Sequence, residues 1–232
     1  MKVKLLRYTT DAELLCGAAA LTSAKSGSPS EILEKMNSET AKKIIKRVTG
    51  YGHVSVIEHA SFTFSIEGVS RAMTHQLVRH RIASYTQQSQ RYVTYDTVEK
   101  YVTPPSIVNN TEAKEIFDEA LEKISETYQR LLKLEVPKED ARFILPNAAK
   151  TNIIVTMNAR ELRHFFNLRC CTRSQWEIRE VATEMLRQAK KTAPALFENV
   201  GPSCVELGYC KEGKMKPPEC NIEEIKKRFR NL

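Results

Sequence analysis

Glycine is scarce in this sequence, with eight residues among 232. No G-x-G-x-x-G turn follows a predicted strand, and no G-x4-G-K-[ST] loop occurs. Those motifs use backbone N–H groups to cradle phosphates in Rossmann domains and P-loop NTPases. A phosphorylated ligand would therefore have to be held by side chains, and the available groups are Arg79, His80, Arg81, Arg91 and Arg142.

Long hydrophobic runs are also missing. No apolar run approaches the ~20 residues that a membrane-spanning helix needs. The N-terminal segment has no apolar signal core before its first acidic residue, Asp11. Hydrophobic residues make up 41% and charged residues 28% of the chain, as in ordinary globular proteins. We therefore expect a cytoplasmic protein with no membrane partner.

The cysteines follow no disulfide or metal pattern. Six cysteines at irregular spacing, without a signal peptide, predict free thiols. Cys204, Cys210 and Cys220 are separated by six and ten positions, which does not match a standard zinc motif. We expect thiols and no metal here, and a metal site is the less favoured alternative.

The formal net charge of +8 favours anionic partners. Lysines are scattered along the chain, whereas arginines gather at short motifs. Clustered arginines suit discrete phosphates better than a long polyanion, so we expect a small-molecule ligand and no nucleic acid. An RNA- or DNA-binding module remains the alternative.

Hydrophobic and capping patterns predict strands interspersed with helices, in an α/β or α+β fold. Phe62, Phe64 and Ile66 alternate with polar neighbours, as in a half-buried strand, and 151–157 is typical of a buried strand. The predicted strands are 3–8, 60–67, 91–95 and 151–157, with 82–90 as a loop. Four predicted helices have a cap in the sequence: 12–22 is capped by Asp11, 71 to about 80 is capped by Ser70, and two others begin at the capping boxes Ser28–Glu31 and Ser174–Glu177, the second of them ending near Lys191. The other predicted helices are 39–49, 111–135, a short one after Pro137, and 158–169.

The helix predicted at 111–135 has the longest periodic pattern. Its apolar residues recur at threes and fours, and they are Ala113, Phe117, Ala120, Ile124, Tyr128 and Leu131. Such a stripe packs either on the core of the same chain or on a partner subunit. Nothing in it indicates chemistry.

The stretch Gln76–Arg91 concentrates polar chemistry. It contains Arg79-His80-Arg81 and Ser89-Gln90-Arg91, with further glutamines between them. Arginine presents a planar fork of donors to phosphate or carboxylate oxygens, and hydroxyls and amides add uncharged hydrogen bonds. These residue types describe a site for a phosphorylated small molecule. The alternative is a solvated basic loop.

The spacing in this stretch, RHR-x7-S-x-R, resembles the signature of the flavin-dependent thymidylate synthases. Three further segments resemble the same family: 52–59 (GH-x-S-x-x-EH), 142–146 (RFILP) and 158–169 (NAR…H…NLR). The resemblance implies an α+β fold, with a mixed sheet flanked by helices in a single catalytic domain at 1–200. It also implies a homotetramer with sites between subunits. The Cys- and Lys-rich tail at 201–232 lies outside it.

The resemblance implies methylation of dUMP to dTMP with 5,10-methylenetetrahydrofolate as carbon donor and FAD, reduced by NADPH, as hydride source. It assigns catalysis to Arg169. It assigns FAD binding to Ser55, Arg79, His80, Arg81, Gln87, Asn158, Ala159, Arg160 and His164. It assigns dUMP binding to Gln76, Leu77, Val78, Arg79, Gln87, Gln88, Ser89, Gln90, Arg91, Arg142 and Arg169.

An arginine suits the catalytic position because uracil C5 is a weak nucleophile. A permanent charge with a forked donor beside the pyrimidine N3 and its adjacent oxygen stabilises the anionic ring. An ion pair at a helix end is the alternative role for Arg169. Ser89 has no adjacent histidine base, so a hydrogen bond to the nucleotide is preferred over a nucleophilic role. Many family members have glutamate where this chain has Gln87.

Overall fold

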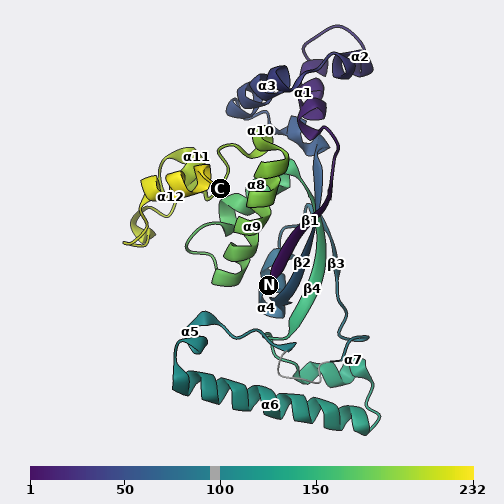
Figure 1. Ribbon diagram of the computed structural model, residues 1–232, viewed down its shortest axis with the longest axis vertical. Helices are drawn as coiled ribbons and strands as arrows, with labels where there is room; N and C mark the ends of the chain where they lie inside the picture. The colour runs from purple at the N-terminus through teal and green to yellow at the C-terminus, as the bar shows by residue number, and fades with distance from the viewer. Residues whose placement is uncertain (95–99) are drawn as a thin grey trace. The chain divides into compact units, whose positions relative to one another are not determined.

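The sheet of this protein has four strands in the order β1-β2-β4-β3 (Figure 1). The computed structural model describes residues 1–94 and 100–232. The strands are β1 (Lys2–Tyr8), β2 (Ser61–Ser70), β3 (Ala83–Gln87) and β4 (Lys150–Asn158). With the helices around it, this sheet confirms the predicted mixture of α and β structure.

Strands β2 and β4 run antiparallel. The hydroxyl oxygens of Thr63 and Thr156 lie 2.9 Å apart. Further along β2, the Gly68 N–H donates to Asn152 Oδ1 at 2.9 Å. Residue numbers fall along β4 as they rise along β2, so the two strands point in opposite directions.

One face of β4 is buried. Ile153, Val155 and Met157 are buried, whereas Ile154 between them is 43% exposed. The predicted strand is therefore confirmed, although only one of its faces is buried, because an antiparallel strand needs cover on one face only. The alternation predicted for β2 is confirmed, since Phe62, Phe64 and Ile66 are all fully buried.

The chain divides into two compact units, and all four strands contribute residues to both. The first unit comprises 1–2, 66–79 and 86–153, and the second comprises 3–65, 80–85 and 154–232. Helical segments of the first unit are α4 (Arg71–Leu77), α5 (Pro105–Val108), α6 (Thr111–Lys133), α7 (Lys138–Ala141) and η3 (Arg142–Ile144). Those of the second are α1 (Ala12–Thr22), α2 (Pro29–Glu34), α3 (Ser38–Gly50), η1 (Val54–His59), α8 (Ala159–Arg169), α9 (Trp176–Thr192), α10 (Pro194–Phe197), α11 (Ser203–Leu207), η4 (Gly213–Met215) and α12 (Ile222–Arg230).

Each unit has its own packed interior. In the second unit, Phe197 of α10 meets the rings of Phe62 and Phe166 edge-on, with centroids 5.4 and 6.0 Å away. In the first unit, α6 buries Leu121 and Tyr128 in a cluster, so the predicted amphipathic helix packs on a core of its own chain. Within the described ranges, no helix combines the length and apolar character needed to cross a membrane.

Helix starts follow the predicted caps in part. Ser28 forms the predicted capping box with Glu31, and Ser70 accepts from the Met73 N–H at the start of α4. Asp11 does not cap α1 with its side chain, because its backbone is left-handed with φ of 50°.

Two helix boundaries also differ from the prediction. Helix α4 ends at Leu77, before the predicted end near residue 80. Gln175, rather than Ser174, caps α9, since the Ser174 hydroxyl donates to the Leu168 carbonyl. A capping-box pattern does not determine which of two neighbouring polar residues is the N-cap of the helix.

Strand β3 was not predicted. Residues 83–87 were assigned to a loop, and 91–95 to a strand. In the structure 91–94 are not in a strand, and residue 95 lies outside the described residues. The sequence of β3 is ASYTQ, which lacks the apolar alternation that identifies a half-buried strand. Strand β3 is an edge strand of the sheet, and it pairs with β4 on one side only.

The close approach of α1 and α3 depends on Gly17. A Cβ built at Gly17 lies 3.0 Å from both Cα and Cβ of Ala41, and the Cα belongs to the α3 backbone. We expect Gly17→Ala to destabilise the protein by about 1 kcal/mol or more, because overpacking against a backbone exceeds the gain in helix propensity. Gly50→Ala is the matched control, since a Cβ there meets nothing within 4 Å. Equal denaturation midpoints for the two variants would contradict this packing argument.

Candidate active site

Helix α8 carries the second ligand-binding stretch predicted from the sequence. It follows β4 directly, and the Asn158 side chain caps it by accepting from the Glu161 N–H at 2.9 Å. Arg169 is the last residue of the helix, where the negative end of the helix dipole favours a cation. The predicted boundaries of this helix are therefore confirmed.

Arg169 contacts His80, which in turn contacts Glu161. The Arg169 Nε–H donates to His80 Nε2 at 3.1 Å, and His80 Nδ1 lies 3.3 Å from Glu161 Oε1. The His80 and Glu161 side chains are only 4% and 8% exposed. The structure thus joins one residue of the signature, the predicted catalytic arginine, and a glutamate that sequence reasoning did not identify.

Burial keeps the His80 ring neutral. Desolvation, reinforced by the positive charge of Arg169 and by His164, lowers the pKa of His80 from 6.5 to about 4. Desolvation raises the pKa of the Glu161 carboxyl, an effect that His164 opposes. The contact between His80 and Glu161 at neutral pH is therefore a hydrogen bond that a neutral imidazole donates, rather than an ion pair.

A cavity of about 380 Å³ is lined in part by Glu161. Its lining includes three of the predicted flavin residues, Asn158, Arg160 and His164, together with Glu161. Arg160 forms an ion pair with Glu58, another lining residue. The volume is in the range of small-molecule sites, and the lining sets one permanent cation, Arg160, against two carboxyl groups, Glu58 and Glu161.

Gln87 is fixed by two hydroxyl groups of the first unit. Its amide nitrogen donates to Thr74 Oγ1 at 2.9 Å and lies 3.4 Å from Thr151 Oγ1. The neighbouring Gln88 is held through its carbonyl, which accepts from Arg71 at 2.7 Å. The neutral amide in place of the family's glutamate thus donates to hydroxyl oxygens, which a carboxylate cannot do.

Glu139 connects two of the predicted nucleotide-binding arginines. The Arg91 guanidinium lies 2.8 Å from the Glu139 carboxylate, and the Arg142 Nε–H donates to the Glu139 carbonyl at 3.0 Å. The Arg91 N–H also donates to Ser89 Oγ at 3.2 Å. Ser89, Arg91 and Arg142 are therefore brought together within the first unit.

The other predicted residues differ in exposure. Ser55, Val78, Arg79 and Arg81 are exposed, and Gln76, Gln88 and Gln90 are half-buried. The side chains of Leu77 and Ala159 are buried, so a ligand contact from either would use its backbone.

Sequence reasoning missed Glu139 and Glu161 because neither belongs to a motif. A signal for Glu161 was present in the sequence. It lies beside Leu162 and one helical turn before Phe165, both of which are buried. A carboxylate on the apolar face of a helix needs a buried partner, so its position alone could have identified it.

All six cysteines are free. Burial, and then the thiols of Cys220, Cys171 and Cys210, raise the pKa of Cys204. The Thr172 hydroxyl lies 3.8 Å from the Cys220 sulfur. Within 1–94 and 100–232, no group of three or more His, Cys, Asp or Glu side chains has an arrangement that could hold a metal ion.

Known proteins resemble this chain over its whole length. Residues 4–195 match the family described as thymidylate synthase complementing protein. A flavin-dependent thymidylate synthase of Geobacter sulfurreducens is 49% identical over 234 residues, which cover all of this chain and 99% of that protein. This chain is a member of the flavin-dependent thymidylate synthases. The enzyme of that name from Pyrococcus abyssi is 48% identical over 95% of this chain and 93% of its own length.

The fold agrees with that of a solved family member. The crystal structure of the flavin-dependent thymidylate synthase of Helicobacter pylori, complexed with FAD and dUMP, has a TM-score of 0.69 to this chain. The similarity covers 87% of this chain and all of the Helicobacter pylori chain, at 24% sequence identity. At that identity the likeness concerns the fold.

Proposed function

We propose that this protein methylates dUMP to dTMP, with 5,10-methylenetetrahydrofolate as carbon donor and FAD, reduced by NADPH, as hydride source. The observation that carries the proposal is the contact of Arg169 with His80, since it joins the two motifs on which the family resemblance rests. When bound, FAD would supply the hydride that completes the methyl group. The folate would supply the carbon, and residues of the chain would bind and activate the nucleotide.

Arg169 is the proposed catalytic residue. Its guanidinium would stabilise the pyrimidine as negative charge develops at N3 and the adjacent oxygen, which increases electron density at C5. A preorganised cation in a partly buried site is effective because little reorganisation is needed during the reaction. Its position at the end of α8, with Nε held by His80, fixes the direction of the charge.

The nucleotide and the flavin are assigned to the residues expected from the sequence. Arg91, Arg142 and Ser89 supply charged and neutral donors for the dUMP phosphate, and binding would replace the Glu139 contact of Arg91. The cavity lined by Asn158, Arg160 and His164 would receive part of FAD. The Arg160 guanidinium would exchange its Glu58 contact for the FAD pyrophosphate.

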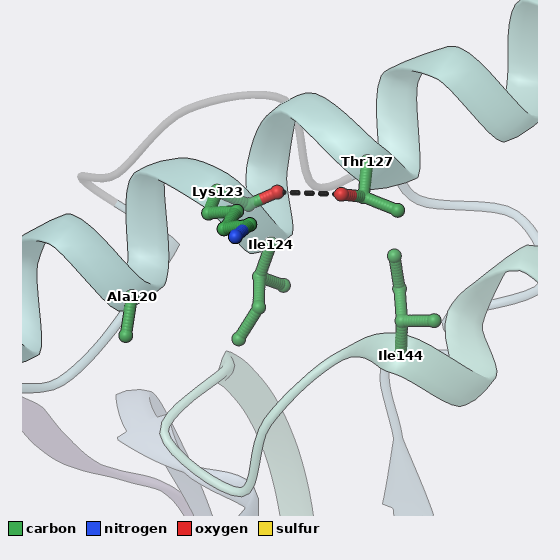
Figure 2. Close-up of a pocket in the computed structure, with 5 residues that line it drawn as sticks. All are labelled: Ala120, Lys123, Ile124, Thr127 and Ile144. Atoms are coloured by element: carbon green, nitrogen blue, oxygen red, sulfur yellow. Dashed lines mark hydrogen bonds between the residues drawn. The ribbon is translucent and has the colours of Figure 1, made fainter.

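We also propose the finer organisation implied by the family: catalysis by residues 1–200 with an added tail at 201–232, a cytoplasmic location, and a homotetramer. An apolar surface on the first unit supports self-association. Figure 2 shows Ala120 and Ile124 of α6 and Ile144 of η3 around a cavity of about 310 Å³. Phe143, which precedes Ile144 in the chain, is 82% exposed. Contiguous apolar surface of this kind is typical of protein interfaces.

The direct test is the colour and reactivity of the purified protein. We expect a yellow protein, or one that takes up added FAD, whose flavin absorbance is bleached by NADPH under anaerobic conditions. With dUMP and 5,10-methylenetetrahydrofolate it should then form dTMP. A colourless protein that rejects FAD, but binds RNA with a steep dependence on salt concentration, would support the nucleic-acid-binding alternative instead.

A further inference from the structure

We propose that Glu161 and His80 are positioning residues that orient the Arg169 guanidinium toward the pyrimidine through a buried Glu161–His80–Arg169 chain of hydrogen bonds. The inference rests on the proposed function of Arg169. It adds a role for Glu161, which belongs to no binding motif of the sequence.

The hydrogen-bond chain fixes one tautomer of His80. Arginine has N–H donors and no acceptor, so the His80 Nε2 atom that faces Arg169 Nε must accept. The single proton of the neutral ring is then on Nδ1, and it donates to Glu161 Oε1. The Glu161 carboxylate therefore stabilises the tautomer that presents a lone pair to Arg169. In the other tautomer, two N–H groups would face each other.

Packing holds the His80 ring in this orientation. The ring of Phe165 meets it edge-on, with centroids 4.9 Å apart and an angle of 84° between planes. The Tyr85 hydroxyl donates to the His80 carbonyl at 2.8 Å, which anchors the backbone. His164 packs against the ring from α8 with centroids 5.8 Å apart. Rotation of the ring would separate both nitrogen atoms from their partners.

The contact with His80 sets the plane of the Arg169 guanidinium. Its Nε–H donates to a buried ring whose own orientation is fixed by packing against Phe165. Catalytic groups held by such outer partners lose about 10- to 100-fold in activity when the partner is changed, as measured for metal ligands. Glu161 should therefore influence turnover more than substrate affinity.

The closing experiment is a double-mutant cycle between Glu161→Gln and Arg169→Lys. Glu161→Gln keeps the shape but removes the charge that fixes the His80 tautomer. We expect kcat of the flavin-loaded protein for dTMP formation to fall about 10- to 100-fold, with the KM for dUMP nearly unchanged. In an Arg169→Lys background the same substitution should cause almost no further loss, because its effect passes through the arginine.

Glu206→Gln is the matched control. It neutralises a glutamate that pairs with Arg163, also on α8, at 2.9 Å. This variant should keep the wild-type kcat. Glu161→Asp provides a second variant, since it keeps the charge but withdraws it from His80, and it should lower kcat in the same arginine-dependent manner.

Two results would overturn the proposal. One is a wild-type kcat for the flavin-loaded Glu161 variants. The other is a loss of kcat on Glu161→Gln that is equally large in the wild-type and Arg169→Lys backgrounds. That result would mean that Glu161 contributes to general stability and does not act through Arg169. Either result leaves the proposed function intact, whereas a wild-type protein that forms no dTMP would reject that function itself.

Discussion

Arg169→Ala is expected to abolish dTMP formation while FAD remains bound. The guanidinium is assigned to the pyrimidine ring and not to the cofactor, so flavin uptake and reduction by NADPH should continue. Removing one preorganised donor from an oxyanion site typically costs about 10²- to 10³-fold in kcat. The loss of a permanent positive charge should reach at least that size. Single-turnover assays of dTMP, with flavin absorbance recorded in parallel, separate the two effects.

Arg169→Lys should recover little of this activity. An ammonium group keeps the charge but does not reproduce the planar fork, and it has no Nε–H at the position where His80 accepts. Arg173→Ala is a suitable control, because Arg173 forms an ion pair with Glu212 and has no assigned role at the site. Near-normal turnover in Arg169→Ala would remove the residue from the mechanism.

Local patterns explain which helices could be predicted. Helix α8 begins at an asparagine cap and ends where its motif ends, and α6 has a clear apolar period. Strand β3 could not be found in this way, because a polar edge strand is defined by its partner in the sheet. The left-handed backbone of Asp11 could not be predicted either, because aspartate is in general a favoured N-cap residue.

The site shows the same limit at longer range. The motif residues Arg169 and His80 were predicted, but as separate groups with separate ligands. Their partners are far away in sequence, at separations of 89 residues between Arg169 and His80 and 81 between His80 and Glu161. No local pattern specifies such pairs. The sequence therefore identified the charged groups, while the structure identified what holds them.

The assembly of the site can be tested by mixing two inactive variants. The family resemblance implies sites between subunits, which would place the Arg91 end of the signature loop and the Arg169 of one site on separate subunits. Arg91→Ala removes a half-exposed side chain that pairs with Glu139, so it should leave the fold intact. Each variant alone is expected to be nearly inactive, one without a nucleotide contact and the other without the charge at the ring.

Co-expression of Arg91→Ala and Arg169→Ala, or unfolding and refolding of the two together, should restore part of the activity. Some sites will then combine an intact Arg91 from one subunit with an intact Arg169 from another, and these sites are chemically wild type. Random mixing in a symmetric oligomer predicts recovery of about a quarter of wild-type dTMP formation per site. Differently tagged subunits and sequential affinity purification verify that the oligomers are mixed.

A mixture of Arg91→Ala with Ser89→Ala is the matched control. Both lesions lie in the same loop, so every site would receive one of them whichever subunit supplies it, and activity should stay at the level of the parents. Sites contained within one chain predict no recovery in the first mixture either, because each site would then keep one lesion. Verified mixed oligomers of Arg91→Ala and Arg169→Ala that remain inactive would therefore reject the shared site, without affecting the assignment of the flavin.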